Sequence, residues 1–164
     1  QTNAAAELHT DSAYRKDPER TFLLACQTKA ETGGETLLLS VKDVLQALHN
    51  QAWTEEEIAL LRQPIWRWRV PKVFQTSPLD RLSPHSPILM PAGGMRWRHD
   101  NLVAPNPIAA GVADRLAKLI QHHPQTERLT LFPGDILICS NTRALHGRSE
   151  FYGSRRLFYR VRIK

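Results

Sequence analysis

Short apolar segments, bounded by Gly, Pro, Asn or Asp, are the feature that most constrains the fold of this chain. Largely apolar segments of five to eight residues are typical of strands. We expect strands at Thr21–Thr28, Glu35–Ser40, Arg128–Phe132, Ile136–Ser140 and Arg156–Ile163. Helical patterns are fewer, and they are expected at Val41–His49, from Thr54 to Pro64, and from Pro107 to about His122. The sequence therefore predicts a mainly β fold of antiparallel strands. The favoured form is a double-stranded β-helix (jelly roll) with a few covering helices.

Two further segments alternate aromatic residues with arginines. Ile65–Val70 reads IWRWRV, and Met95–His99 reads MRWRH. Because alternate residues of a strand point to opposite faces, we interpret these segments as strands with a buried aromatic face and solvated arginines. In an alternative interpretation, one of these arginines reaches a substrate carboxylate. A Pro- and Ser-rich connector, Ser77–Pro91, lies between the two segments.

The length of 164 residues suits one domain, and 41% hydrophobic residues suffice for a core. Apolar runs fall far short of the roughly 20 residues that a membrane span needs, so no membrane association is expected. The start of the chain has no signal-peptide pattern. Cys26 and Cys139 both lie in strand-like runs, without a CxxC motif, which indicates reduced core cysteines and a cytoplasmic protein.

The net charge of +6 comes from one end of the chain. From Arg143 to Lys164 there are seven basic residues and one acidic residue, and the rest of the chain has 15 of each. A nucleic-acid-binding protein more often has a long basic stripe, whereas a local arginine cluster suits a small anion. We therefore expect a small-molecule partner rather than a nucleic acid.

Three residues form a candidate metal site. His9 and Asp11 are two residues apart, so on an extended chain their side chains point the same way. With His146, they supply the two imidazoles and one carboxylate that bind one face of Fe(II) in non-haem oxygenases. His99 and Asp100 are a rival pair, but adjacent strand residues point to opposite faces.

Arginines on the last expected strand suit an anionic ligand. Arg156 and Arg160 are four residues apart and share a face of that strand. An arginine inside a barrel is costly unless an anion meets it. A dicarboxylate would provide a bidentate, charge-assisted partner.

In their order and spacing, four motifs resemble those of the Fe(II)/2-oxoglutarate-dependent dioxygenases of the taurine dioxygenase and clavaminate synthase-like family. These motifs are His9-Thr10-Asp11 (HxD), Gly33-Gly34-Glu35-Thr36, Pro133–Arg148 and Arg156–Val161 (RxxxRV). The resemblance runs from His9 to Ile163 and implies a jelly-roll oxygenase with His9, Asp11 and His146 as the Fe(II) ligands.

The resemblance also implies a cosubstrate site. Arg156 binds the distal carboxylate of 2-oxoglutarate, with Thr36 assisting, and Arg160 faces the other carboxylate or a substrate carboxylate. Arg155 is the alternative to Arg156, because the motif also aligns one residue earlier.

The implied reaction is O2-dependent hydroxylation of an aliphatic carbon in a small carboxylate-bearing molecule, such as an amino acid or a derivative. It converts 2-oxoglutarate to succinate and CO2. The alternatives are an alkylsulfonate-type oxygenase and a catalytically silent jelly-roll binding module. Because the family core includes a strand before the HxD motif, we expect residues 1–164 to be a single jelly-roll domain that lacks an N-terminal segment of a longer protein.

Overall fold

The computed structural model describes residues 3–50, 52–77, 81–153 and 155–164, and residues 78–80 of the expected connector lie outside this description. The strands are β1 (Ala6–His9), β2 (Thr21–Thr28), β3 (Thr32–Gly33), β4 (Thr36–Ser40), β5 (Arg67–Trp68), β6 (Leu89–Met90), β7 (Gly94–Met95), β8 (Leu102–Val103), β9 (Glu127–Leu129), β10 (Ile136–Ser140), β11 (Ala144–Arg148), β12 (Phe151–Tyr152) and β13 (Leu157–Ile163). The helices are α1 (Val41–Asn50), α2 (Glu55–Arg62) and α3 (Pro107–Gln121), with short 3-10 turns at Lys72–Phe74, Pro91–Gly93 and His99–Asn101.

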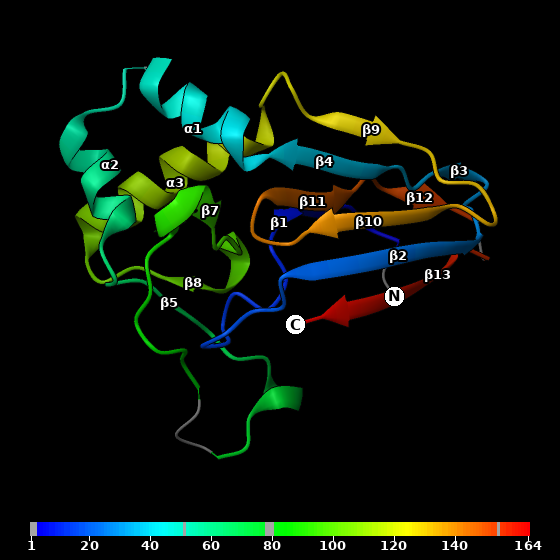
Figure 1. The fold of residues 1–164 in the computed structure, drawn as a ribbon, viewed down its shortest axis with the longest axis horizontal. Helices are drawn as coiled ribbons and strands as arrows, with labels where there is room; N and C mark the ends of the chain where they lie inside the picture. The colour runs from blue at the N-terminus through cyan, green and yellow to red at the C-terminus, as the bar shows by residue number, and fades with distance from the viewer. Residues whose placement is uncertain (1–2, 51, 78–80, 154) are drawn as a thin grey trace.

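Two sheets form the body of the fold (Figure 1). One has the strand order β1-β11-β4-β9, and the other has the order β10-β2-β13. Every strand pair in the two sheets is antiparallel. The mainly β, antiparallel jelly roll expected from the sequence is therefore confirmed.

The inner face of β2 lies against the four-stranded sheet. Phe22, Leu24 and Cys26 alternate along β2 and are buried. The Phe22 ring lies 4.2 Å from the His146 ring on β11, between ring centroids. The space between the sheets therefore contains apolar packing and a candidate metal ligand side by side.

The three helices gather at one end of the sheets (Figure 1). Thr54 and Glu57 form a capping box at the start of α2, and the Asn106 side chain caps α3 just before Pro107. These local signals explain why the helices begin where the sequence indicates. Their apolar faces join the main core, in which Val44, Ile58 and Leu116 are buried.

The two alternating segments form less strand than expected. Only Arg67 and Trp68 of the first segment are a strand, and the second segment contributes only Met95, in β7. The aromatic half of the prediction is confirmed, since the side chains at Trp66, Trp68 and Trp97 are at most 1% exposed.

The prediction of solvated arginines is wrong at Arg96, which is 7% exposed. Its guanidinium donates to the backbone carbonyls of Ala13, Arg15 and Lys16, at 3.4, 2.9 and 3.2 Å, and to Ser86 Oγ at 3.1 Å. These acceptors bind both Nη groups of the buried cation, which alternation along the sequence does not reveal. Its Nε is buried without a hydrogen-bond partner among the described residues. Arg96 thereby fixes the segment that follows Asp11.

Cys26 and Cys139 are both free, as expected from their spacing. Cys26 is buried in β2 and Cys139 is half-buried in β10. Among the described residues, no helix combines the length and the apolar character that crossing a membrane requires.

Candidate metal centre and cosubstrate cavity

His9 and His146 lie opposite each other on neighbouring strands. They are Cα partners in the antiparallel pair β1–β11, and their ring centroids are 4.5 Å apart. The pairing is irregular between Ala6 and His9, where the register shifts. Strand pairing thus brings together two imidazoles from opposite ends of the sequence.

Asp11 lies in the turn after β1 and is held there by Asn141. The backbone N–H of Asp11 donates to Asn141 Oδ1 at 2.7 Å, and Asn141 Nδ2 donates to the carbonyls of Asp11 and Glu19 at 3.1 and 2.8 Å. Asn141 is 1% exposed. Sequence reasoning assigned Asn141 only to a turn. Its position directly after the strand β10 is the one available signal of this role.

The three predicted metal ligands lie close enough to share an ion. His9 Nε2 lies 3.8 Å from Asp11 Oδ1, and His146 Nε2 lies 3.7 Å from the same oxygen. One ligand atom from each residue lies within 4.8 Å of the other two. Within the described ranges this is the one cluster of three such side chains.

The protonation states also suit a cation. His9 Nδ1 donates to the Glu7 carbonyl at 2.7 Å, which leaves Nε2 free to bind. Burial lowers the pKa of His9 to about 3, with help from the charges of His146 and Arg98, and burial also lowers the pKa of His146. Both imidazoles are therefore neutral near pH 7.

Asp11 is ionised. Burial opposes its ionisation, but contacts with His146, Arg160 and Arg162 outweigh burial and hold its pKa below the usual value. Both ring nitrogens of His146 are buried without a hydrogen-bond partner in the described part of the chain. Because such orphaned groups are costly, two imidazoles and a carboxylate in this arrangement fit Fe(II) well.

Arg160 points at Asp11 rather than at an open space. Its guanidinium contacts both carboxylate oxygens, at 2.9 and 3.0 Å, and Arg162 Nε lies 3.5 Å from Oδ2. The family resemblance implied that Arg160 faces a cosubstrate or substrate carboxylate, and in this structure the carboxylate that it contacts is that of Asp11. Arg162 was not expected at the site.

A cavity of about 340 Å³ is lined by two of the three predicted ligands, His9 and His146, and we call it the cosubstrate cavity. It is lined by the predicted residues Thr36, Arg156 and Arg160. Arg155, the alternative to Arg156, is exposed and does not line it. The remaining lining residues are Ala6, His9, Phe22, Leu24, Arg98, His146, Gly147, Arg148 and Phe158, so the lining contains several cations and no acidic residue.

The surroundings of Arg156 favour the binding of an anion. Its guanidinium lies over the Phe158 ring at 3.9 Å and near the Phe151 ring at 5.6 Å. Its Nε is buried and has no hydrogen-bond partner among the described residues. Burial lowers the pKa of Arg156 to about 10, and the charge of Arg148 adds to this effect. A carboxylate would satisfy both its charge and its donors.

The paired glycines before Thr36 have a steric reason. Gly33 and Gly34 both have positive φ, at 72° and 75°. A Cβ on Gly33 would collide with the Glu150 carbonyl oxygen, and a Cβ on Gly34 would lie 3.2 Å from Arg156 Nε. Glycine at position 33 therefore allows close approach of the Glu150 backbone, and glycine at position 34 leaves room for Arg156.

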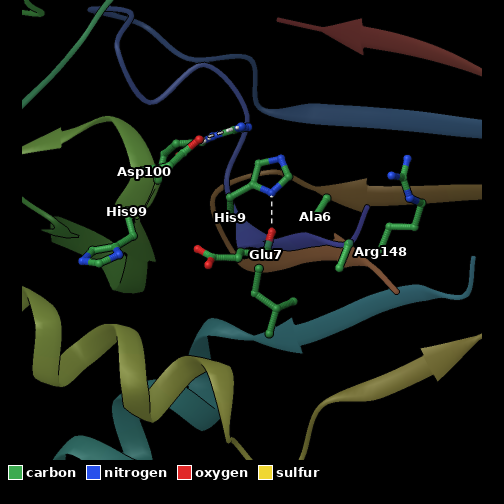
Figure 2. A pocket seen from close by; sticks show the side chains of 9 residues that line it. Ala6, Glu7, His9, His99, Asp100 and Arg148 are labelled. Carbon is green, nitrogen blue, oxygen red and sulfur yellow. Dashed lines mark hydrogen bonds and ion pairs between the residues drawn. The ribbon is translucent and has the colours of Figure 1, made fainter. Parts of the chain in front are cut away.

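The rival pair His99 and Asp100 does not form a metal site. His99 Nε2 contacts Asp114 Oδ1 at 3.0 Å, and the ring stacks on Trp97. Asp100 pairs with Arg98. In Figure 2 the His99 side chain lies apart from His9.

Known proteins resemble this chain in sequence or in fold. L-lysine 3-hydroxylase of Catenulispora acidiphila is 30% identical over 154 residues, which cover 88% of this chain and 40% of that protein. Asparagine oxygenase, solved with Fe(II), 2S,3S-3-hydroxyasparagine and succinate, superposes on this chain with a TM-score of 0.81 at 19% identity. The match covers 98% of this chain and 50% of the asparagine oxygenase chain.

The non-haem iron oxygenase OrfP, solved with Fe and α-ketoglutaric acid, has a TM-score of 0.72 at 22% identity, over 95% of this chain and 48% of its own. The chain thus spans half or less of the length of these relatives. Residues 1–162 match the family model described as taurine catabolism dioxygenase TauD, TfdA family. The chain therefore belongs to the TauD/TfdA family of dioxygenases.

Proposed function

We propose that this chain forms the catalytic core of an Fe(II)- and 2-oxoglutarate-dependent oxygenase. Its proposed reaction hydroxylates an aliphatic C–H of a small amino acid or a derivative and converts 2-oxoglutarate to succinate and CO2. The observation that carries the proposal is the convergence of His9, Asp11 and His146 beside an arginine-lined cavity. Relatives described as acting on lysine and asparagine support the substrate class.

Each residue has a defined task in this proposal. His9, Asp11 and His146 hold the metal from one side and leave its other side open to ligands. Arg156 binds the distal carboxylate of 2-oxoglutarate, with Thr36 beside it in the cosubstrate cavity. Phe22 and Phe158 line the same cavity and keep water away from the reacting groups. Fe(II), when bound, supplies the redox chemistry that couples O2 to C–H oxidation.

Anaerobic titration tests the enzyme class. Adding Fe(II) and then 2-oxoglutarate to the protein is expected to produce a weak visible absorption band, and His146→Ala should abolish it. Absence of the band in the unaltered protein would favour the catalytically silent binding module.

A substrate panel tests the reaction. Lysine, asparagine and arginine are compared with taurine, and succinate is quantified in the presence of O2. Stimulation by an amino acid supports the proposal. Stimulation by taurine alone would instead favour the alkylsulfonate-type oxygenase.

We also propose that residues 1–164 are one jelly-roll domain of a longer polypeptide. The outward face of the β10-β2-β13 sheet supports this idea, because Ile136, Ile138, Tyr159 and Val161 are each at least 51% exposed there. The greater length of the relatives agrees with it. Intact-mass measurement on the natural protein is expected to give a value well above 18.7 kDa, and a value equal to this mass would contradict the proposal.

A further inference from the structure

A second cavity meets the cosubstrate cavity at His9. It has a volume of about 400 Å³, and we call it the rim cavity. The two cavities share Ala6, His9, Arg98 and Arg148. Figure 2 shows Asp100 and Arg148 on either side of His9 in the rim cavity.

The two cavities differ in charge. The cosubstrate cavity is lined by arginines without an acidic residue, which suits a dianion. The rim cavity adds Glu7 and Asp100, so it presents both signs of charge. A ligand that fits the rim cavity by charge therefore has both a cationic and an anionic group.

Arg98 and Asp100 form a bidentate ion pair at this rim. Arg98 Nε lies 2.8 Å from Asp100 Oδ1, and Arg98 Nη2 lies 3.2 Å from Oδ2. Burial opposes the ionisation of Asp100, but the hydrogen bond and charge of Arg98 prevail and lower its pKa. The two side chains are 38% and 56% exposed. Because exposed ion pairs contribute little stability, each partner is easily exchanged for a ligand group of the same charge.

The other arginines at the site have different partners. Arg156 stacks on Phe158, Arg160 contacts Asp11, and Arg148 lies over the Phe151 ring. Arg96 of the same alternating segment is committed to backbone carbonyls. Arg98 therefore combines exposure, proximity to His9 and a readily exchanged carboxylate partner.

We propose that Arg98 binds the carboxylate, and Asp100 the ammonium, of an α-amino acid substrate in the rim cavity. This inference rests on the proposed function and assigns residues to its substrate. The head group of an α-amino acid has one carboxylate and one ammonium. When it replaces the contact between Arg98 and Asp100, each of these side chains gains a partner of opposite charge, so no charge is left unpaired. Since His9 lines the same cavity, an amino acid bound there lies next to one of the three candidate metal ligands.

The experiment measures binding rather than turnover. The protein with Fe(II) and 2-oxoglutarate is titrated anaerobically with L-lysine, L-asparagine and L-arginine, and the dissociation constant is taken from the change in the visible band. The amino acid that binds most tightly is then compared with its decarboxylated amine and its deaminated acid. Each analogue lacks one of the two charges.

The variants separate the two contacts. Arg98→Gln should weaken amino acid binding by about tenfold or more, the loss expected for a charge-assisted pair, without weakening the decarboxylated amine. Asp100→Asn should weaken amino acid binding similarly without weakening the deaminated acid. Arg115→Gln is the control, because Arg115 pairs with Glu57 outside the rim cavity, at 2.7 Å.

Other binding results would contradict either the inference or the proposed function. Equal weakening of all three ligands by both variants shows a structural role and overturns the inference. Unchanged binding, or a visible band that no amino acid alters, also overturns it while leaving the metal and cosubstrate assignment intact. Absence of the band in the unaltered protein contradicts the proposed function itself.

Discussion

His146 on β11 is the Cα partner of His9 on β1, and the two rings lie 4.5 Å apart between centroids. The register of one strand pair thus sets the separation of two candidate metal ligands. Asp11 completes the group from the turn that follows β1. The geometry of the site is therefore a direct product of sheet pairing.

Removing a ligand should abolish activity without unfolding the chain. Asp11→Ala and His146→Ala are each expected to lower succinate production by at least about a hundredfold, since they remove direct ligands rather than supporting groups. Circular dichroism should remain close to that of the unaltered protein. His49→Ala is the control, because His49 is exposed in the last turn of α1 and lines neither cavity of the site. Retained turnover in both ligand variants would contradict the metal assignment.

Arg156→Lys should raise the 2-oxoglutarate concentration required for half-maximal succinate formation. Lysine keeps the charge but loses the planar fork that grips a carboxylate. We expect an increase of about tenfold. Arg155→Lys, one residue away and exposed, should change it little. A larger effect at Arg155 would move the carboxylate-binding role to that residue.

Gly34→Ala should weaken 2-oxoglutarate binding and also reduce stability. The new methyl group would lie 3.2 Å from Arg156 Nε, and the alanine would also have to adopt the positive φ of Gly34. The strain alone costs about 1–2 kcal/mol. Gly134→Ala is a matched control, because Gly134 has φ 98° and open space around it. Unfolding curves and 2-oxoglutarate titrations separate the two effects, and equal cosubstrate affinity in both variants would contradict the steric role.

Acidification should destabilise the metal-free protein. The pKa of His9 is about 3 in the folded chain against the usual 6.5, so between these values the unfolded chain binds a proton that the folded chain does not. The free energy of unfolding therefore falls as pH falls, by up to ~1.4 kcal/mol per pH unit for this group. The lowered pKa of His146 acts in the same direction.

Urea unfolding at several pH values between 7 and 5 measures how the free energy of unfolding depends on pH. His9→Gln should make the dependence on pH shallower, because glutamine does not titrate. The same slope in both proteins would show that His9 is not the source.

Arg96→Met should destabilise the fold by about 2–4 kcal/mol, because it removes the donor to one buried and two partly buried carbonyls. Denaturant unfolding gives the value. Arg69→Met is the control, since Arg69 is exposed and the change should stay within about 0.5 kcal/mol. Similar losses in the two variants would show that the carbonyl contacts of Arg96 contribute little.

Local patterns predicted much of the fold. The apolar segment at β2 and the capped, amphipathic α3 agree closely with the structure, because hydrophobic periodicity and capping residues act over a few neighbours. The strand β11 was missed, since His146-Gly147-Arg148 has no strand-like alternation. Its position depends on pairing with β4 and β1, which are distant in sequence.

The candidate site was predictable only in part. Spacing placed His9 and Asp11 on one side, His146 was proposed as the second imidazole of a metal-binding set, and the resemblance to a family implied the same three ligands. Neither source indicated that Asn141 holds Asp11 or that Arg160 and Arg162 neutralise it. Those contacts arise where strands from both sheets meet, and a single sequence contains no signal for such long-range neighbours.

The separation of these contacts along the chain has a consequence for biogenesis. The bond between Asp11 and Asn141 spans 130 residues. Contacts of this separation generally form late in folding, because a long loop must close first. A nascent chain that has emerged from the ribosome only as far as α3 has His9 and Asp11 but not His146. The three candidate ligands are therefore together only after β11 has been synthesised, so shorter nascent chains have no complete site for a metal ion.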